Sequence, residues 1–260
     1  MSDAAAENIL TIRGVTKRFS VGDGELEALA AVDLSIPTGE FVCMIGASGC
    51  GKSTLLRIIA GFEEPTTGNV AMYGKAITGP GSDRGMVFQD YALFPWMTVS
   101  QNVSFGPRQR QLPREEIAKT ADEFVRMVGL ERFADRYPNQ LSGGMKQRVA
   151  IARVLANNAS ILLMDEPFGA LDALTREQLQ NELLQIWKRT GVTTIFVTHS
   201  VEEAVLLADR VLVMSAGPGR IESDFRIDLP RPRDVSSPEF NALRRDIARR
   251  LTSHLALARA

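Results

Sequence analysis

The sequence contains few cysteines and no long apolar segment, and each shortage excludes a class of protein. Two cysteines, Cys43 and Cys50, among 260 residues are too few for a disulfide scaffold, and they show no metal-ligand spacing. No run of eighteen apolar residues occurs, so we expect no stretch of this sequence to span a bilayer. The formal net charge of −1 lacks the basic excess of a general nucleic-acid binder, so no nucleic-acid partner is expected.

The remaining composition is that of an ordinary globular protein. Hydrophobic residues make up 45% and charged residues 23% of the chain. A length of 260 residues suffices for one large domain with a subdomain or appendage. The first ten residues lack the basic-then-apolar pattern of a secretory signal, so cytosolic residence is the default expectation. The sequence has no internal repeat and no low-complexity segment.

Four short apolar segments predict the strands of a mostly parallel α/β sheet. Each is followed by a turn or helix signal, as is typical of buried parallel strands. These segments are "FVCMI" (41–45), "GMVF" (85–88), "ILLM" (161–164) and "TTIFV" (193–197). Residues 26–36 predict a further strand, antiparallel and near an edge.

A block of about seventy residues, 90–158, predicts helices and loops in place of a simple crossover. We therefore expect a helical subdomain inserted in the α/β core. Within it, residues 113–130 have apolar residues at helical spacing, with Pro113 as a helix start and Gly129 as a stop.

Two capping boxes and a basic tail complete the predicted helices. Thr175 with Gln178, and Ser200 with Glu203, have the spacing of capping boxes. The arginine-rich tail 231–260 predicts an amphipathic surface helix. A membrane-surface or partner-binding role for this tail is the alternative.

The strongest single motif is "GASGCGKST", which follows an apolar strand and precedes a helical run. Glycines let successive N–H groups converge on an anion without Cβ clashes. Lys52 is expected to reach the β- and γ-phosphates of a nucleotide, and the Ser53 hydroxyl to ligate Mg²⁺. The alternative is a glycine turn that binds nothing, and Cys50 is a filler of the loop or a site of thiol sensitivity. The predicted nucleotide-binding residues are Gly46, Ala47, Ser48, Gly49, Cys50, Gly51, Lys52, Ser53 and Thr54.

Polar residues end the other three predicted strands. Asp165 and Glu166 follow "ILLM", and because adjacent residues cannot point the same way, we expect different tasks for them. Asp165 is expected to face Mg²⁺ through water, and Glu166 to polarise the water that attacks the γ-phosphate. Gln89 suits a magnesium or water contact, and His199 a contact to the γ-phosphate. Ligands collect at the carboxyl ends of parallel strands, so these residues are predicted to form one catalytic site with the phosphate loop.

A second phosphate-facing motif lies about ninety residues after the first. In "LSGGMKQRVA" (141–150), Ser142, Gly143 and Gly144 precede a predicted helix, whose free N–H groups and dipole favour an anion. One nucleotide cannot readily be bound by two separate helix starts of one rigid chain. A second copy that approaches head to tail supplies the missing half, so ATP is predicted to join two subunits in a C₂ pair.

In this order and spacing, the motifs resemble those of the nucleotide-binding subunit of an ATP-binding cassette (ABC) transporter, along nearly the whole chain to about residue 230. The resemblance implies an α/β fold: a P-loop NTPase core with a mostly parallel sheet, an antiparallel β edge subdomain and an inserted helical subdomain. It implies ATP and Mg²⁺ as cofactors, and residues 1–230 as an ATPase domain. By the same resemblance, the functional segments are the Walker A loop, the Q-loop at Gln89, the signature at 141–145, the Walker B strand, the D-loop with Asp172, the switch histidine His199, and Phe19 as the aromatic that stacks on adenine. Met145 departs from the commonest signature, which has glutamine there; we expect a change in nearby packing and no loss of the site.

Longer segments, among them "VFQDYALFPWMTVSQNVSFG" and "LPRPR", are similar to subunits of the nitrate, sulfonate and taurine importer group. That resemblance implies a peripheral location on the cytoplasmic face of the inner membrane, transmembrane permease subunits as partners, and an indirect link to a periplasmic or extracellular substrate-binding protein. Phe94, Trp96 and Met97 are the predicted groove for a permease helix, and packing within the subdomain is the alternative for them.

Two other function classes stay open. A soluble ABC ATPase of DNA repair or translation usually has a coiled-coil insertion, zinc-binding cysteine pairs or two cassettes in one chain. An exporter cassette is normally fused to membrane helices. This sequence contains none of these features. The transported solute leaves little mark on such a subunit, so nitrate, sulfonates and taurine all remain open.

Overall fold

The computed structural model describes residues 7–22, 24–215 and 217–257, which divide into two compact units. The first unit combines Met1–Pro80 with Thr193–Ala260, and the second is Gly81–Val192. The second unit is therefore an insertion, in sequence terms, between two segments that fold together.

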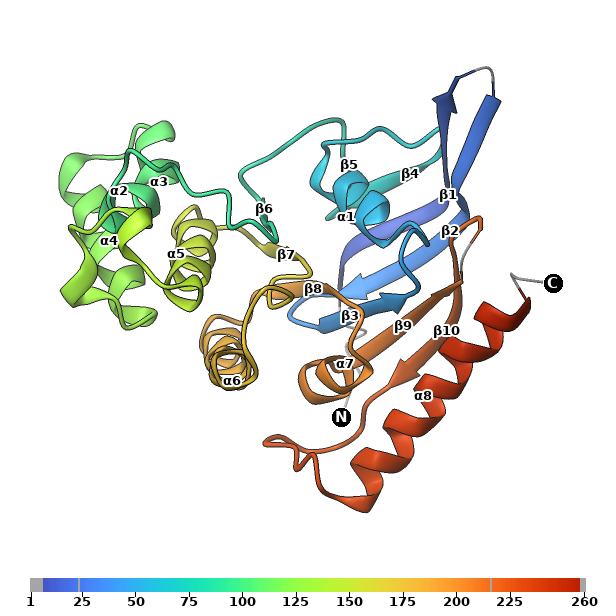
Figure 1. Ribbon diagram of the computed structural model, residues 1–260. Helices are drawn as coiled ribbons and strands as arrows, with labels where there is room; N and C mark the ends of the chain where they lie inside the picture. The colour runs from blue at the N-terminus through green and yellow to red at the C-terminus, as the bar shows by residue number, and fades with distance from the viewer. Residues whose placement is uncertain (1–6, 23, 216, 258–260) are drawn as a thin grey trace, which may run out of the picture. The chain divides into compact units, whose positions relative to one another are not determined.

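The first unit contains an antiparallel sheet, drawn in blue and cyan in Figure 1. Its strands are β1 (Asn8–Val21), β2 (Gly24–Pro37), β4 (Thr67–Met72) and β5 (Lys75–Ala76), in the order β2-β1-β4-β5. Strand β2 forms the edge and pairs antiparallel with β1, so the prediction for 26–36 is confirmed. Its apolar residues alternate with polar ones, the pattern of a sheet with one buried face.

The parallel strands of the first unit lie in a second sheet, in the order β10-β9-β3-β8. Strand β3 (Phe41–Gly46) pairs in parallel with β8 (Thr193–Thr198) on one side and β9 (Arg210–Ser215) on the other, and β10 (Arg220–Arg226) is antiparallel to β9. Every residue of β3 and β8 is buried, as continuous apolar runs in a covered parallel sheet require.

Three helices belong to the first unit: α1 (Lys52–Ala60), α7 (Val201–Leu207) and α8 (Pro238–Leu257). Helix α8 is the predicted tail helix, and it packs on α7 and β9 (Figure 1). Phe240 and Ile247 on α8 are 1% and 0% exposed. One face of the tail is thus part of the core of the first unit.

The second unit pairs two parallel strands, β6 (Arg84–Val87) and β7 (Ile161–Asp165), with a group of helices. These are α2 (Val99–Val103), α3 (Phe105–Gln109), α4 (Arg114–Met127), α5 (Gly143–Ala156) and α6 (Ala173–Thr190), with short 3₁₀ turns at Glu131–Phe133 and Pro138–Gln140. Helix α5 contacts α2, α3, α4, α6 and β6, and nine of its residues are buried. It is the central helix of this unit, as a helix that is apolar on most sides must be.

The helix boundaries test the predicted start and stop signals. Helix α4 begins after Pro113 and is followed by Gly129 at φ 68°, as predicted. The predicted capping box at Thr175 and Gln178 is wrong, because α6 begins earlier and Asp172 is its N-cap. The Asp172 side chain accepts a hydrogen bond from the Thr175 backbone N–H at 3.0 Å. Aspartate is as good a cap as threonine, and the upstream residue gives a longer helix.

No helix in the described part of the chain is both long and apolar enough to cross a membrane.

Candidate functional site

The phosphate loop connects β3 to α1 in the first unit and depends on glycine at two positions. Gly49 and Gly51 have φ of 77° and 93°, which L side chains rarely adopt. A Cβ on Gly51 would also lie 2.8 Å from the Ala28 carbonyl oxygen. Gly51 is the N-cap of α1, so the loop leads directly into the N-terminus of a nine-residue helix. The N-terminal end of a helix, where backbone N–H groups point outward, favours an anion.

Lys52 lies folded against this loop and is only 5% exposed. Its ammonium donates hydrogen bonds to the carbonyl oxygens of Gly46 and Ala47, each at 2.9 Å. Cys50 is fully buried beneath the loop, where a Cβ on Gly46 would approach its Sγ to 2.5 Å. Cys50 therefore acts as packing under the loop, and the cationic group is held at the loop itself.

His199 lies beside the phosphate loop because β3 and β8 are adjacent and parallel. Ile45 pairs with Thr198 in the register of the two strands, so Gly46 and His199 leave the sheet at the same edge. His199 is exposed, whereas Thr198 is buried. The Thr198 hydroxyl donates to the Glu203 carboxylate and accepts from the Ser200 N–H, which fixes the turn that follows the strand.

Phe19 is half-buried on β1, and its ring has a cation over one face. The Lys17 ammonium lies 4.8 Å from the ring centroid and pairs with Glu63 at 2.9 Å. It also donates to the Glu64 carbonyl oxygen. The ring is thus held by a lysine that is itself fixed at two points.

In the second unit, Gln89 and Glu166 lie near one another at the ends of β6 and β7. These strands are parallel, with Val87 paired to Met164. A Cβ on Gly169 would lie 3.5 Å from Gln89 Nε2 and 4.0 Å from a Glu166 carboxylate oxygen. The amide and the carboxylate therefore flank the same short turn, which Asp165 and Glu166 enter from β7.

Glu166 has a left-handed backbone, with φ 44°. A non-glycine residue in this region costs on the order of 1–3 kcal/mol, and such strain concentrates at functional sites. The Gly169 N–H donates to the Glu166 carbonyl oxygen at 3.1 Å, which closes the strained turn. The structure thus holds this carboxylate in a conformation that local preference alone would not select.

Ser142 is the N-cap of α5, as the sequence predicts, and its hydroxyl accepts from the Met145 N–H at 3.3 Å. Gly143 and Gly144 form the first turn and lie close to other parts of the unit. A Cβ would lie 3.1 Å from the Tyr91 hydroxyl at Gly143, and 2.9 Å from a Thr175 methyl at Gly144. The departure at Met145 leaves the cap intact, because the cap uses only the Met145 backbone.

Asp172 caps α6 and is exposed. Hydrogen bonds from the Thr175 backbone and hydroxyl lower the pKa of Asp172 below its usual range. The carboxylate is therefore negative at neutral pH and lies at a helix N-terminus, where negative charge is favoured.

The segment after Gln89 contains two consecutive left-handed residues, Tyr91 at φ 64° and Ala92 at φ 44°. Arg153 on α5 donates to the Ala92 carbonyl oxygen at 2.7 Å and to that of Tyr91 at 3.4 Å. Its guanidinium also lies 5.6 Å from the Phe94 ring centroid. Burial lowers the pKa of Arg153. One arginine thus supports a strained segment that the sequence alone does not reveal.

The predicted partner residues lie in the loop that follows. Phe94 packs on Phe105 with ring centroids 4.5 Å apart, and Met97 is half-buried, so these two side chains contribute to packing within the subdomain. Trp96 is 68% exposed. Asn102, fully buried, accepts from the Phe94 N–H and donates to the carbonyl oxygens of Phe94, Met97 and Thr98. Asn102 thereby fixes the loop that presents Trp96.

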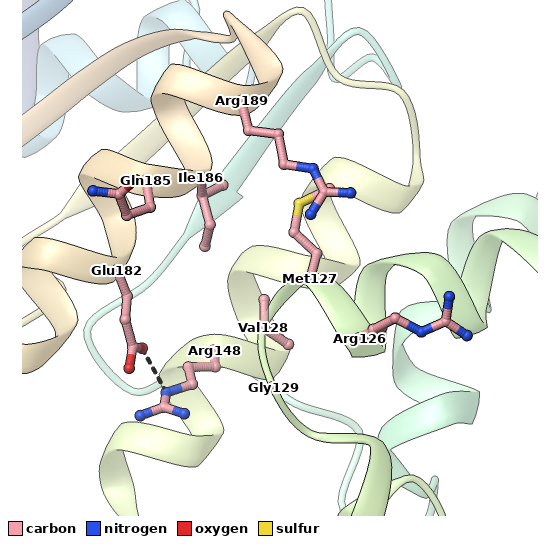
Figure 2. Close-up of a pocket in the computed structure, with 9 residues that line it drawn as sticks. All are labelled: Arg126, Met127, Val128, Gly129, Arg148, Glu182, Gln185, Ile186 and Arg189. Carbon is pink, nitrogen blue, oxygen red and sulfur yellow. Dashed lines mark ion pairs between the residues drawn. The ribbon is translucent and has the colours of Figure 1, made fainter.

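A pocket of about 310 Å³ lies between α4, α5 and α6, away from these residues (Figure 2). It has an apolar part formed by Met127, Val128 and Ile186. Arg148 forms an ion pair with Glu182 at 2.7 Å, and in Figure 2 the Arg126 guanidinium points away from that pair. The arginines do not converge, so the pocket lacks the arrangement of an anion site.

The sequence thus predicted the position of the phosphate loop, the starts of α1 and α5, and the polar residues that follow the strands. It missed four side chains that bind backbone carbonyls of two other segments, the loop 91–98 and the C-terminal end of α7 (Val201–Leu207). These are Asn102 and Arg153 in the second unit, and Arg231 and Arg233 in the first. Their only sequence signal is a polar residue inside an otherwise apolar or turn-rich segment.

The phosphate loop between a buried parallel strand and a helix defines a nucleotide-binding protein of the P-loop α/β class. The family model described as ABC transporter matches residues 29–169, more than half of the chain. The chain therefore belongs to the ABC transporter family.

Similar proteins of known description indicate which kind of ABC protein this chain resembles. An uncharacterized ABC transporter ATP-binding protein of Methanocaldococcus jannaschii is 55% identical over 92% of this chain and 89% of its own length. The nitrate import ATP-binding protein of Synechocystis is 49% identical over 91% and 89%, and the taurine import ATP-binding protein of Roseobacter denitrificans is 48% identical over 92% of each. These relatives support the importer group and not a cassette of DNA repair or translation.

A solved structure supports the fold. The dimeric post-hydrolysis state of an ATP-binding cassette bound to ADP and Pi is 36% identical, with a TM-score of 0.74, and covers 85% of this chain and 100% of its own. The predicted fold class, a P-loop NTPase α/β core with an antiparallel edge sheet and inserted helices, is confirmed.

Proposed function

We propose that this chain is the ATP-hydrolysing subunit of an ABC importer. Two copies close on ATP, and their closure powers the uptake of a small solute through separate membrane subunits. The observation that carries this proposal is the phosphate loop, with its two left-handed glycines and buried Lys52 at the carboxyl end of β3. The names of the nitrate and taurine import relatives support a solute of that kind: nitrate, a sulfonate, taurine or a similar molecule.

In the proposed site, oxygen donors from this chain would help to hold Mg²⁺. The Ser53 hydroxyl, the Gln89 amide oxygen and Asp165, through water, are hard ligands of the type that Mg²⁺ prefers. When bound, Mg²⁺ would neutralise charge on the nucleotide phosphates. Lys52 binds the β- and γ-phosphates, together with the backbone N–H groups of residues 46–54, and Phe19 stacks on adenine.

Hydrolysis then requires little covalent chemistry from the protein. Glu166 accepts a proton from the attacking water, and His199 holds the γ-phosphate in line. Charge that spreads over the γ-phosphoryl oxygens is stabilised by Lys52 and the loop N–H groups.

The second copy contributes the remaining phosphate contacts. Ser142, Gly143 and Gly144 lie at the N-terminus of α5, a fourteen-residue helix whose dipole favours an anion. Asp172, at the start of α6, belongs to the same subunit contact. The dimeric assembly of the related cassette supports this arrangement.

The membrane partner docks on the loop that presents Trp96. Exposure of a large aromatic side chain on a loop fixed by the buried Asn102 suits a preformed contact with an apolar helix. We place the subunit peripherally at the cytoplasmic face of the cell membrane. The permease connects it indirectly to a substrate-binding protein outside. Residues 1–230 form the ATPase domain, including the helical subdomain near 90–158, and 231–260 form its basic tail.

The experiment that tests the reaction is the substitution Glu166→Gln. It preserves size and removes the base, so phosphate release should fall by about 10²–10⁴, the usual contribution of a general base. ATP affinity, measured by equilibrium titration, should be retained. Glu177→Gln on α6, an exposed carboxylate, is the control. Wild-type turnover in Glu166→Gln would refute the assignment.

A further inference from the structure

Helix α7 follows the switch histidine directly and is too short to hold its own position. It has seven residues, Val201–Leu207, and its N-cap Ser200 is the residue after His199. Isolated helices need on the order of 12–15 residues to be even marginally stable in water, so the place of α7 is set by the groups at its ends and sides.

Two arginines from the "LPRPR" segment bind the C-terminal end of α7. Arg233 donates to the carbonyl oxygens of Val205 at 2.7 Å, Leu206 at 3.2 Å and Ala208 at 2.6 Å. Arg231 donates to the carbonyl oxygen of Leu207. The last carbonyls of a helix have no partner within the helix, and here four successive ones receive guanidinium donors.

The same arginines connect this helix end to the body of the first unit. Arg233 also donates to the carbonyl oxygens of Ile227 at 3.2 Å and Leu229 at 3.1 Å. Arg231 forms an ion pair with Asp209, whose carboxylate accepts from the Phe41 N–H at 3.0 Å. Arg231 and Arg233 together form an arginine clamp on the end of α7. Through Asp209 this clamp is anchored at Phe41, the first residue of β3, the strand that leads to the phosphate loop.

Holding two half-buried guanidinium groups close together is costly. Burial, with a smaller contribution from Arg231, lowers the pKa of Arg233 to about 10. Arg233 remains charged at neutral pH, and positive charge at a helix C-terminus interacts favourably with the dipole. The arrangement is thus a strong, directional contact and not a loose surface pair.

The other end and side of α7 are fixed as well. The Ser200 hydroxyl accepts from the Glu203 N–H at 3.2 Å, and the Glu203 carboxylate accepts from the Thr198 hydroxyl. The tail helix α8 packs along α7, and Arg244 pairs with Glu202 at 3.7 Å. A rigid rod of seven residues, about 10 Å at 1.5 Å per residue, therefore joins the arginine clamp to the residue after His199.

We propose that Arg233, with Arg231, is a positioning residue for His199: by fixing the C-terminal end of α7, the C-terminal segment sets where the histidine lies relative to the phosphate loop. This inference rests on the proposed contact of His199 with the γ-phosphate. A misplacement of about 1 Å at a catalytic group costs on the order of 10²-fold in rate, so a small shift of α7 has a large effect.

The first test follows the histidine itself. The chain contains two histidines, His199 and His254, so a sample with labelled histidine gives two sets of ring signals, assigned with His254→Gln. Arg233→Met should shift or broaden the His199 ring signals. Arg233→Lys should have a smaller effect, because it keeps the positive charge but loses the planar guanidinium that donates several hydrogen bonds at once. Arg226→Met, an exposed arginine on β10, is the control and should leave them unchanged.

The second test is a double-mutant cycle on ATP hydrolysis. Arg233→Met should lower kcat about tenfold or more at an unchanged KM for ATP, and should add nothing in a His199→Ala background. A purely structural arginine would lower the melting temperature and reduce kcat equally in both backgrounds. Where Arg233→Met fails to fold, Arg233→Lys is used in the same cycle.

The outcomes separate the inference from the proposed function. Unshifted His199 signals in folded Arg233→Met, or additive losses of kcat, overturn the positioning role even when His199→Ala is inactive. Wild-type kcat in His199→Ala, with shifted signals in Arg233→Met, instead contradicts the proposed role of the histidine.

Discussion

At the residue scale, the Lys52 side chain fixes the position of the positive charge at the phosphate loop. Its ammonium satisfies two loop carbonyls at 2.9 Å, so the charge is already at the place where phosphates are expected to bind. A side chain held in this way loses little conformational entropy on binding a ligand.

We expect Lys52→Ala to weaken ATP binding by about 10–100-fold, because a hydrogen bond to a charged group contributes roughly 1.5–3 kcal/mol. Isothermal titration with Mg-ATP measures the change. Lys75→Ala, an exposed lysine on β5, should bind as the wild type does. Equal affinity in Lys52→Ala and wild type would contradict the phosphate-loop assignment.

Residues that act through their own local sequence were predictable, and residues that act at a distance were not. Gly51 and Ser142 are visible because a left-handed turn and an N-cap depend on neighbours within a few positions. Asn102 and Arg233 bind backbone carbonyls, which every residue has, so no partner residue type marks the contact. The distance from Arg233 to Val205 along the chain adds to this difficulty.

At the scale of elements, the conformation of the loop from Phe94 to Thr98 is fixed by hydrogen bonds. Asn102 makes hydrogen bonds at both of its ends, and Arg153 supports the two left-handed residues before it. Trp96 is exposed on this fixed support, which lowers the entropy cost of docking a partner.

Trp96→Glu should remove the stimulation of ATP hydrolysis by the membrane subunits, because a charge at the centre of an apolar contact leaves it desolvated and unpaired. Hydrolysis by the isolated chain should stay within about twofold, since surface substitutions rarely disturb the fold. Reconstitution in vesicles measures both rates. Tyr137→Glu, another exposed aromatic of the second unit, is the comparison. Loss of both rates would indicate a packing role, and normal stimulation would exclude the proposed contact.

Strands and helix N-termini were largely predicted from the sequence, but not every element boundary was. Strands β3, β6, β7 and β8 follow from apolar runs, but β9, which is also a buried apolar run, was missed. Strand β1 was missed because charged residues such as Lys17 and Arg18 interrupt it. The start of α6 was placed too late, because a threonine and an aspartate three residues apart are both good caps. The structure decides between these two N-cap candidates.

At the scale of the whole molecule, the proposed nucleotide site is complete only when a second copy of the chain binds. Ser142 lies at the N-terminus of α5 and is exposed in the single chain. In the proposed dimer, a nucleotide bound to one subunit meets the second phosphate-facing helix on the other subunit.

In the Glu166→Gln background, Mg-ATP should convert the chain from monomer to dimer, and Ser142→Arg should prevent this, because a large side chain blocks the approach of the phosphate. Sedimentation velocity measures the doubling of mass. Ser236→Arg, at an exposed position of the first unit, should still dimerise. A dimer that persists in Ser142→Arg would show that the signature segment does not face the nucleotide.

The interrupted course of the first unit has a consequence for biosynthesis. Strand β3 is buried, and its two neighbours, β8 and β9, are translated about 150 residues later. At roughly 5–20 residues per second, the ribosome needs on the order of ten to thirty seconds to supply them. By the end of that interval the intervening residues 81–192 have been translated, while the strand that leads to the nucleotide loop still lacks both its partners. The strand that leads to the phosphate loop therefore gains both its neighbours only after residues 193–215 have been made.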